Sequence, residues 1–512
     1  MIKIKADQLS EQHLAEVALA VQNRWNVATF VKMHEIIVMD DEVDDESLRR
    51  IVSAPIDARE VERGMRVIMG NLELDRAFAL EKDGKSNFKL KLIDATQIPK
   101  WVERSTSNMR QPPEGVFECP HCVPPDTLIL GDNKAISGYS KGDSVIGQTG
   151  LTEVQEKFVH PYKGDLVIIR ANGLLPIVTT PEHPIMVANS RSLSTKVLPN
   201  EVLFSIKKWV SAKDAVPKNS GTDGDYLIVP LINGSFQEYE VSLLRFIKKM
   251  KPRHKAYRTH FPLNEGTAWL LGIFVAEGSV TKEVRFSLNK KEKQIEAKIA
   301  TIANGLGYSS YISSIQNWNS MLVSIPSRVL ARAFDEWCGH KAPNKMMPDF
   351  ILFHRDERIL RAFLDGYEAG DSYVATNKLR GYKRYKCDVT VSRTLALQLQ
   401  LAYARLGTWA SICQKKSEYE EEIMNRKCRV HVKYAISYPL EPNLKRRKVH
   451  FVEDSILSPI RKVEKLTYDG TVHNVNTSDG TYLVSNAIVH NCGRWFSTDL
   501  ELSMHTKLHY II

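Results

Sequence analysis

The sequence predicts a protein of several domains, in which an all-β domain is interrupted by an α+β domain and itself interrupts a smaller α/β protein. Three observations predict this arrangement. The 512 residues suffice for three or four domains of ordinary size. Residues 122–232 and 449–491 alternate short Val, Ile and Leu runs with Gly, Asp, Asn and Pro, as strands and turns do. Finally, the two halves of one metal-ligand pattern lie 370 residues apart.

Composition excludes several classes of protein. With 43% hydrophobic and 25% charged residues, the chain is globular rather than disordered or fibrous. No stretch approaches the roughly 18 apolar residues of a membrane helix, and the N-terminus lacks the apolar run of a signal peptide. Seven cysteines, an odd number, do not suggest a disulfide framework. We therefore expect a cytoplasmic protein with no membrane partner.

Positive charge is concentrated in the middle of the chain. Residues 233–447 hold 36 Lys and Arg against 21 Asp and Glu, whereas the net charge of the whole chain is only +10. A basic segment of this kind favours contact with a polyanion such as DNA. An ordinary solvated surface of Lys and Arg is the alternative, and charge alone does not exclude it.

A metal-ligand pattern is cut in two. Twelve residues separate Cys492 from His505 and three separate His505 from His509, as in the second half of a two-cysteine, two-histidine zinc finger. The missing cysteine is Cys119, because joining His121 directly to Cys492 leaves two residues between the thiols. Two thiolates and two imidazoles suit tetrahedral zinc. A ββα finger would thus comprise residues 111–121 and 492–512, with zinc bound once they are joined.

The residues at the two joints form a chemical set. Cys122 can attack the carbonyl of His121 to form a thioester, and Cys492 can attack that thioester in turn. The carboxamide of Asn491 can cyclise on its own carbonyl and cut the bond to Cys492. His490 can assist by protonating the leaving amine or by polarising the carbonyl. This chemistry needs no cofactor.

Three further segments resemble the conserved blocks of the intein family. They are Cys122–Ile129 (CVPPDTLI), Thr179–Pro184 (TTPEHP) and the C-terminal pair Gly470–Val475 (GTVHNV) and Thr481–Asn491 (TYLVSNAIVHN). The resemblance implies autocatalytic protein splicing by a horseshoe-like all-β Hint domain formed by residues 122–232 and 449–491.

Four residues take their interpretation from the intein resemblance. It implies that Thr180 and His183 assist the first acyl shift. Asn474 departs from the family pattern, because many members have an aspartate there. Thr481 also departs, because many members have a histidine. These departures could alter how the steps are coordinated or slow asparagine cyclisation, but they remove no nucleophile.

Two segments of the basic middle resemble the LAGLIDADG motif of homing endonucleases. They are Leu270–Gly278 (LLGIFVAEG) and Leu364–Ser372 (LDGYEAGDS). The resemblance implies an α+β domain over residues 233–448 that cuts double-stranded DNA at a specific site. Small residues would let two helices pack closely, and Glu277 and Asp371 at their ends would hold magnesium.

Flanking sequence extends the endonuclease resemblance. The segment Gly339–Pro348 (GHKAPNKMMP) resembles a further endonuclease block, which implies that Lys345 assists phosphate chemistry; a solvated loop lysine is the alternative. Similar stretches after each motif, Arg285–Leu288 and Asp388–Val391, indicate an internal duplication.

The flanks form the host of the insertion. The pattern of residues 1–110 predicts an amphipathic helix at residues 7–24 and strands around residues 28–39 and 87–93. It indicates no activity. The joined finger could bind DNA or protein. An alternative interpretation of the whole chain is a stable zinc-finger DNA-binding regulator that carries an inert, non-splicing insertion.

Overall fold

The computed structural model describes ten segments of residues 121–491 and the backbone of three strands near the N-terminus; at residues 189, 377, 383, 419–423 and 426–430 it describes the backbone alone. The chain divides into two compact units, one formed by Met1–Cys119 with Arg494–Ile512 and the other by Pro120–Gly493. The ten segments are residues 121–189, 207–218, 224–247, 258–314, 319–377, 383–415, 419–423, 426–440, 449–452 and 454–491.

The first unit contains a small antiparallel sheet. Its strands are β1 (Ile68–Met69), β2 (Arg76–Asp83) and β3 (Asn87–Asp94), in the order β1-β2-β3. The strand predicted at residues 87–93 is confirmed as β3. The helix expected at residues 7–24 and the strand expected around residues 28–39 lie outside the described residues, as do the proposed zinc ligands Cys119, Cys492, His505 and His509.

The second unit begins and ends in a ten-stranded sheet. Its main path runs β26-β27-β9-β11-β25-β7-β6, and β24, β8 and β10 pair at its sides. Among the described residues of 122–232 and 449–491, regular structure consists of strands and two 3₁₀ turns, so the all-β prediction is confirmed. The ten strands of the large sheet are β6 (Ser144–Gly147), β7 (Gly150–Ala171), β8 (Ile177–Thr179), β9 (Pro184–Asn189), β10 (Lys207–Ser211), β11 (Asp225–Pro230), β24 (His450–Val452), β25 (Ser455–Thr477), β26 (Thr481–Val484) and β27 (Ala487–His490).

Two features of the strands hold this sheet together. The long strands β7 and β25 pair antiparallel from Val154 to Ala171, with a register shift between Ile460 and Lys462. The central strand β11 is buried along its whole length. A strand that is covered on both faces reads as a continuous apolar run, which explains the sequence YLIV within β11.

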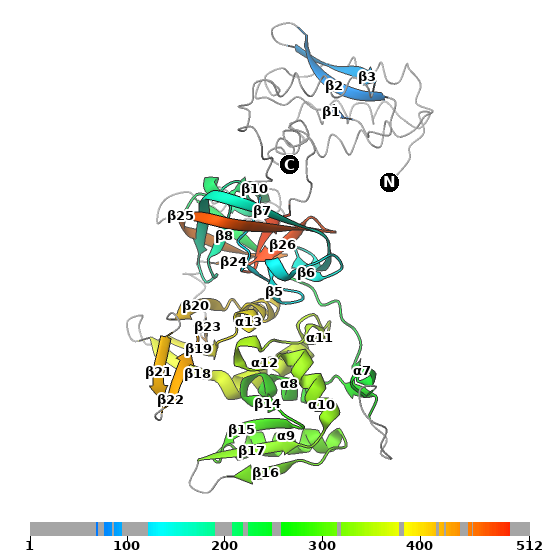
Figure 1. Ribbon diagram of the computed structural model, residues 1–512, viewed down its shortest axis with the longest axis vertical. Coiled ribbons are helices and arrows are strands. Elements are labelled where there is room, and N and C mark those ends of the chain that lie inside the picture. The colour runs from blue at the N-terminus through cyan, green and yellow to red at the C-terminus, as the bar shows by residue number, and fades with distance from the viewer. Residues whose placement is uncertain are drawn as a thin grey trace. The chain divides into compact units, whose positions relative to one another are not determined.

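The α+β domain consists of two copies of one arrangement (Figure 1). In each copy a long helix leads into a four-stranded sheet, in which the last strand along the chain lies between the second and the third. The strand order is β14-β15-β17-β16 in the first copy and β18-β19-β23-β20 in the second. The predicted duplication is therefore confirmed. The first copy comprises α8 (Glu265–Glu277), β14 (Gly278–Val280), β15 (Val284–Asn289), α9 (Lys293–Gly305), β16 (Tyr311–Ser314) and β17 (Ser320–Ile325). The second comprises α12 (Glu357–Asp371), β18 (Ser372–Asn377), β19 (Lys383–Thr390), α13 (Arg393–Arg405), β20 (Ser411–Lys415) and β23 (Lys433–Pro439).

The helices α8 and α12 lie side by side with their backbones nearly touching (Figure 1). A Cβ atom on Gly272 would lie 2.0 Å from the carbonyl oxygen of Phe363, and one on Gly366 would lie 2.1 Å from that of Trp269. Only glycine permits this approach, which is the role predicted for the small residues of the two motifs.

Each long helix has a defined start. Asn264 and Thr267 form a reciprocal capping box at α8, and the Asp356 carboxylate accepts the Arg358 N–H at 3.0 Å at α12. None of the helices in the described part of the chain is both long and apolar enough to cross a membrane.

Candidate functional site

The residues at the His121–Cys122 peptide are held by Thr180, which follows β8, and by His473 within β25. The Cys122 N–H donates to Thr180 Oγ1 at 2.9 Å, and the Thr180 N–H donates to the Cys122 carbonyl at 2.9 Å. One residue later, Val123 exchanges backbone hydrogen bonds of 2.9 and 2.8 Å with His473 on β25. Cys122 is fully buried, with Leu166 and Val472 as its apolar neighbours. The bond that Cys122 would attack is therefore fixed in place before any reaction.

His183 lies against the same peptide. It is fully buried, and burial lowers the pKa of its imidazole well below the usual value; positive charge on His121 and His490 lowers that pKa further. Backbone groups of His121 and Cys122 face the ring and act in the opposite direction. The ring is neutral near pH 7, so it can exchange a proton with the thiol or the amide nitrogen rather than serve as a fixed cation.

Asn474 presents a donor to the other side of this peptide. Its Nδ2 group donates to the carbonyl oxygen of His121, while its Oδ1 atom accepts the Val475 N–H at 2.7 Å. Because the backbone N–H fixes which end of the amide is the oxygen, the NH₂ group faces His121. A donor aimed at this carbonyl would stabilise the oxyanion that forms when a thiol attacks it.

The C-terminal joint is also ordered. Asn491 is buried, and its Nδ2 group donates to Asn476 Oδ1 at 3.0 Å and to Thr477 Oγ1 at 3.1 Å. The Nδ1 atom of His490 contacts the carbonyl oxygen of Asn491, which requires that Nδ1 carry the proton. Burial lowers the pKa of His490 to about 4, so a neutral imidazole polarises this carbonyl at pH 7.

Thr481, one of the two departures from the intein pattern, has a bridging position. Its hydroxyl donates to Asp479 Oδ2 at 3.1 Å and accepts the Gln148 N–H at 2.9 Å. The Thr481 carbonyl accepts from Thr477 Oγ1 at 2.9 Å, and Thr477 in turn contacts Asn491. The link from Thr481 to Thr477 is made by the Thr481 backbone carbonyl, whereas its hydroxyl contacts Asp479 and Gln148.

Strand pairing brings the two joints together. β9 begins one residue after His183, and β27 ends at His490. The two strands are antiparallel neighbours through the pair Val489–Ile185, so the start of one and the end of the other meet at the same edge of the sheet. His490 lies close enough to His183 that protonation of its ring would lower the pKa of His183.

Five of the residues predicted for the joints are therefore gathered at this edge, and their partners come from the same strands. The five are Cys122, Thr180, His183, His490 and Asn491. The sequence interpretation did not identify Asn474 as a donor, nor Asn476 and Thr477 as partners of Asn491. Their location next to the recognised Gly470–Val475 segment is the signal that could have indicated them.

Glu277 and Asp371 form a second candidate site, at the adjoining ends of α8 and α12. A Cβ atom on Gly370 would lie 2.9 Å from Glu277 Cγ, which measures how closely the helix ends approach. Burial, and then the charges of Glu277 and Asp388, raise the pKa of Asp371 to about 7. Burial, and then Glu292, raise the pKa of Glu277. Two acids that repel each other in this way favour binding of a cation between them.

A pocket of about 540 Å³ opens beside Asp371, and Lys345 lies in its wall. The ammonium of Lys345 donates to the carbonyls of Phe274 at 3.0 Å and Gly278 at 2.9 Å, at the C-terminal end of α8. Burial lowers the pKa of Lys345 to about 8. The loop-lysine alternative is wrong, because Lys345 is buried and caps this helix end.

The donor set fits magnesium that is shared with a substrate. Within the described residues no group of three or more His, Cys, Asp or Glu side chains is placed to hold a metal ion. Magnesium usually takes one or two protein carboxylates and completes its shell with water and phosphate oxygens. Glu277 and Asp371 would supply the two protein carboxylates.

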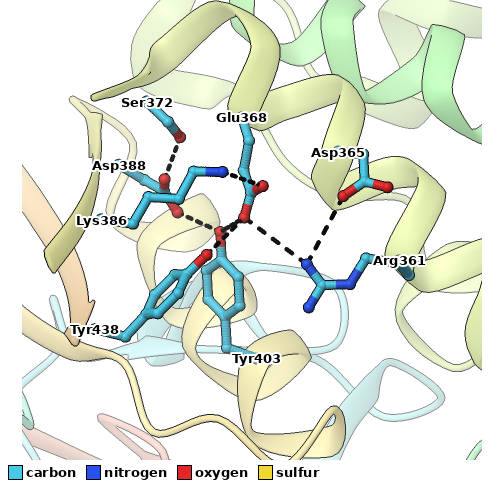
Figure 2. A network of polar contacts seen from close by, with 8 residues as sticks. All are labelled: Arg361, Asp365, Glu368, Ser372, Lys386, Asp388, Tyr403 and Tyr438. Atoms are coloured by element: carbon cyan, nitrogen blue, oxygen red, sulfur yellow. Dashed lines mark hydrogen bonds and ion pairs between the residues drawn. The ribbon is translucent and has the colours of Figure 1, made fainter. Parts of the chain in front are cut away.

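A polar network that the sequence interpretation missed surrounds Glu368 and Asp388 (Figure 2). Tyr403 donates toward Asp388 at 2.5 Å and toward Glu368 at 2.9 Å, and Tyr438 donates to Glu368 at 3.0 Å. Ser372, which replaces the last glycine of the motif, donates to Asp388. Burial raises the pKa of Asp388 to about 6.

The network breaks the symmetry of the two copies. Counting back from Glu277 and Asp371, Phe274 occupies the position of Glu368. In the sheets Gly278 pairs with Phe286, as Ser372 pairs with Asp388. The first copy therefore has Phe274 and Phe286 in edge-to-face contact, with ring centroids 6.1 Å apart. The second copy has the carboxylates of Glu368 and Asp388 at the same two positions.

No family model matches the chain. Curated relatives match most of it at low identity. The chain is 27% identical to an ATP-dependent DNA helicase Hel308 of Thermococcus kodakarensis, over 72% of this chain and 36% of the relative. It is 24% identical to an uncharacterized protein of Methanocaldococcus jannaschii, over 74% of this chain and 51% of the relative. It is 25% identical to an iron-sulfur cluster assembly SufBD family protein of Mycobacterium tuberculosis, over 72% of this chain and 43% of the relative. The chain therefore spans about a third to a half of the length of these relatives.

Solved structures resemble about a third of the chain. The homing endonuclease I-DmoI covers 34% of this chain and 89% of its own, with 13% identity and a TM-score of 0.25. A structure of I-DmoI in complex with DNA and Ca matches with 14% identity and the same TM-score, over 34% of this chain and 83% of its own. A third, with target DNA in the presence of Mg, has a TM-score of 0.24 and 15% identity, over 34% and 88%. At this identity and TM-score the likeness does not bear on activity.

Proposed function

We propose that residues 122–491 excise themselves from this chain as an intein and join residues 1–121 to residues 492–512. The observation that carries this proposal is that both reacting carbonyls have a polar partner at one edge of one sheet. Asn474 donates to the carbonyl of His121, and His490 contacts the carbonyl of Asn491. Both contacts come from side chains that adjoin the reacting bonds, where a donor can act on the carbonyl during attack.

The first proposed step converts an amide into a thioester. Cys122 Sγ attacks the His121 carbonyl, the C–N bond breaks, and the proton moves from sulfur to the departing nitrogen of Cys122. Asn474 stabilises the oxyanion, Thr180 holds the Cys122 backbone, and neutral His183 relays the proton. Cys492 Sγ then attacks the thioester and releases the Cys122 thiol.

The second proposed step cuts the C-terminal joint. Asn491 Nδ2 attacks its own carbonyl carbon to give a succinimide, the bond to the nitrogen of Cys492 breaks, and one proton passes from Nδ2 to that departing nitrogen. His490 donates to the carbonyl oxygen and thereby makes the carbon more electrophilic. The freed amine of Cys492 then attacks the thioester that links it to His121, so that a peptide bond replaces the thioester.

Two further observations support an insertion with these boundaries. The division of the chain into compact units falls within two residues of the predicted joints, with both flanks in one unit. Residues 122–491 also make up about 72% of the sequence. The same share of this chain, 72%, aligns with the helicase and with the SufBD family protein, whose names describe unrelated functions. A portable segment of this size accounts for such matches.

We further propose that the embedded α+β domain is a LAGLIDADG endonuclease that cuts double-stranded DNA. Glu277 and Asp371 would hold magnesium against the scissile phosphate, and the ion would supply an activated water and stabilise the leaving oxygen. The net positive charge of residues 233–447 supports contact with DNA. Lys345 supports the site by anchoring the end of the helix that carries Glu277.

For the host, we propose that zinc binds Cys119, Cys492, His505 and His509 after ligation. The finger would then contact DNA or protein.

One variant separates splicing from an inert insertion. Asn491→Ala removes the only nucleophile of C-terminal cleavage but leaves Cys122 in place. Its purified chain should stay whole alone and release residues 1–121 when a small thiol is added. Asn476→Ala, which removes a partner of Asn491 rather than the nucleophile, should still yield some spliced product. If Asn491→Ala resists thiol and the wild-type chain also stays whole, the alternative of a regulator with an inert insertion holds.

A further inference from the structure

The hairpin β26–β27 ends in a turn of unusual composition. Its two central residues, Ser485 and Asn486, have φ angles of 50° and 68°, in the left-handed region that glycine normally occupies in such turns. Both side chains are almost completely buried. Ser485 Oγ donates to the carbonyl of Pro176 at 3.0 Å, which fastens the turn to the splicing domain itself.

Asn486 fastens the turn to the inserted domain instead. Its Nδ2 group donates to the Leu397 carbonyl and to Gln400 Oε1, each at 3.0 Å, and both acceptors belong to α13. Gln400 is fully buried, and its Nε2 group donates to the Gly173 carbonyl at 2.7 Å and to the Ala410 carbonyl at 2.8 Å. Two of these bonds, to Gly173 and from Asn486, join the two domains, and the bond to Ala410 holds the Gln400 amide in place within the inserted domain.

The hairpin connects this contact to the C-terminal joint. Four residue pairs run from Val484–Ala487 beside the turn to Thr481–His490 at the far end. Because an antiparallel strand rises about 3.4 Å per residue, the turn and the far end of the hairpin are about 10 Å apart along the paired strands. β27 pairs with β9 through Val489 and Ile185 near the joint. The hairpin that carries His490 and Asn491 is therefore fixed by β9 near one end and by α13 at the other.

We propose that α13 positions the C-terminal joint, with Asn486 and Gln400 as positioning residues for asparagine cyclisation. This inference rests on the proposed splicing function. Cyclisation requires Asn491 Nδ2 to reach its own carbonyl carbon while His490 stays on the carbonyl oxygen. A misplacement of about 1 Å in a reaction of this kind can cost about a hundredfold in rate. The inserted domain is then part of the splicing machinery and not only its cargo.

The test uses the full chain with Cys122→Ala, in which only C-terminal cleavage can proceed. Asn486→Gly removes both donors to α13 and keeps a residue suited to positive φ, so the turn itself should persist. We expect the rate at which residues 492–512 are released to fall about tenfold. Asn486→Asp tolerates the same φ but cannot donate when ionised, and it should slow release at least as much.

Asn133→Gly is the matched control. Asn133 also has a positive φ, 56°, and its Nδ2 group contacts Met346 Sδ of the inserted domain at 3.7 Å, but it lies on a turn unconnected to β27. Release should proceed at the parental rate in this variant. In a separate chain with Asn491→Ala, thiol-induced cleavage at Cys122 should be unchanged by Asn486→Gly, because the N-terminal joint does not depend on the hairpin turn.

The outcomes distinguish the inference from the function on which it rests. Unchanged release in Asn486→Gly overturns the positioning role. Equal slowing of both joints overturns it as well, because that result indicates general loosening of the fold. If the Cys122→Ala parent releases nothing and the wild-type chain does not splice, the proposed function itself fails.

Discussion

The side-chain amide of Asn474 donates a hydrogen bond to the carbonyl oxygen of His121, which lies 353 positions earlier in the chain. The sequence pattern places Asn474 where many inteins carry an aspartate. An ionised aspartate has no proton to offer a carbonyl, whereas an amide donates at every pH at which the protein folds. In the proposed splicing reaction, this departure from the pattern would add an oxyanion donor to the N-terminal joint.

Replacing Asn474 should slow the first step selectively. We expect Asn474→Ala to reduce the rate of thioester formation about a hundredfold, as the loss of one oxyanion donor does in other acyl transfers. The measurement is thiol-induced cleavage in the Asn491→Ala chain. Asn474→Asp should be similarly slow at pH 8 and should recover as its carboxyl becomes protonated at lower pH. Rates equal to those of the parent would mean that the contact has no catalytic role.

His490 should make the fold sensitive to acid. Its folded pKa of about 4 lies below the unfolded value of about 6.5, so the unfolded chain binds more protons between these limits. The contribution of the neutral ring to stability is present above about pH 6.5 and is lost as the pH falls toward 4. Urea unfolding of a Cys122→Ala, Asn491→Ala chain at pH 7.5 and pH 5 should show this loss. His490→Gln, which has no titrating ring, should show a smaller difference between the two pH values.

The glycines of the LAGLIDADG-like helices should tolerate no side chain. Gly272→Ala places a methyl group against the Phe363 carbonyl and should lower the free energy of unfolding by about 2–4 kcal/mol. Gly305→Ala is the control, because a Cβ atom there meets nothing within 4 Å. It should be neutral or stabilising by up to about 1 kcal/mol. Similar unfolding midpoints for the two variants would contradict the close helix contact.

Metal binding at Glu277 and Asp371 should strengthen with pH. Because the pKa of Asp371 is about 7, a proton competes with magnesium below that value. The apparent Kd for magnesium, measured by titration calorimetry, should fall about tenfold from pH 6 to pH 8 and level off above it. Asp371→Asn should abolish this dependence and any DNA cleavage while leaving splicing intact. Asp365→Asn, on the same helix with an exposed carboxylate, should change neither.

The parts of the fold that the sequence predicted are those with a local or repeated signal. Alternating apolar runs indicated the strands around β11, and the spacing of two similar motifs indicated the paired helices and the duplication. The residues that chemistry requires at a joint, such as Cys122 and Asn491, could be recognised without knowing their neighbours.

What the sequence could not supply are contacts between distant segments. The motif around Asn474 marks the segment but does not specify that its amide faces His121, and nothing near Glu368 indicates a partner on β19. The link from Glu368 through Tyr403 to the buried Asp388 is invisible because carboxylates in a sequence normally indicate solvent. The helix-capping position of Lys345 also depends on a fold that its own segment does not specify. The zinc ligands lie outside the described residues and stay a prediction of spacing.

The central claim is that this chain cuts and rejoins itself. The most direct measurement is mass spectrometry of the purified wild-type protein, held under reducing, metal-free conditions. Splicing predicts a 370-residue product of about 42 kDa out of the 58.2 kDa total, together with a 142-residue product in which a tryptic peptide contains His121 bonded to Cys492. A protein that keeps its full mass, and never yields that peptide, would contradict the account.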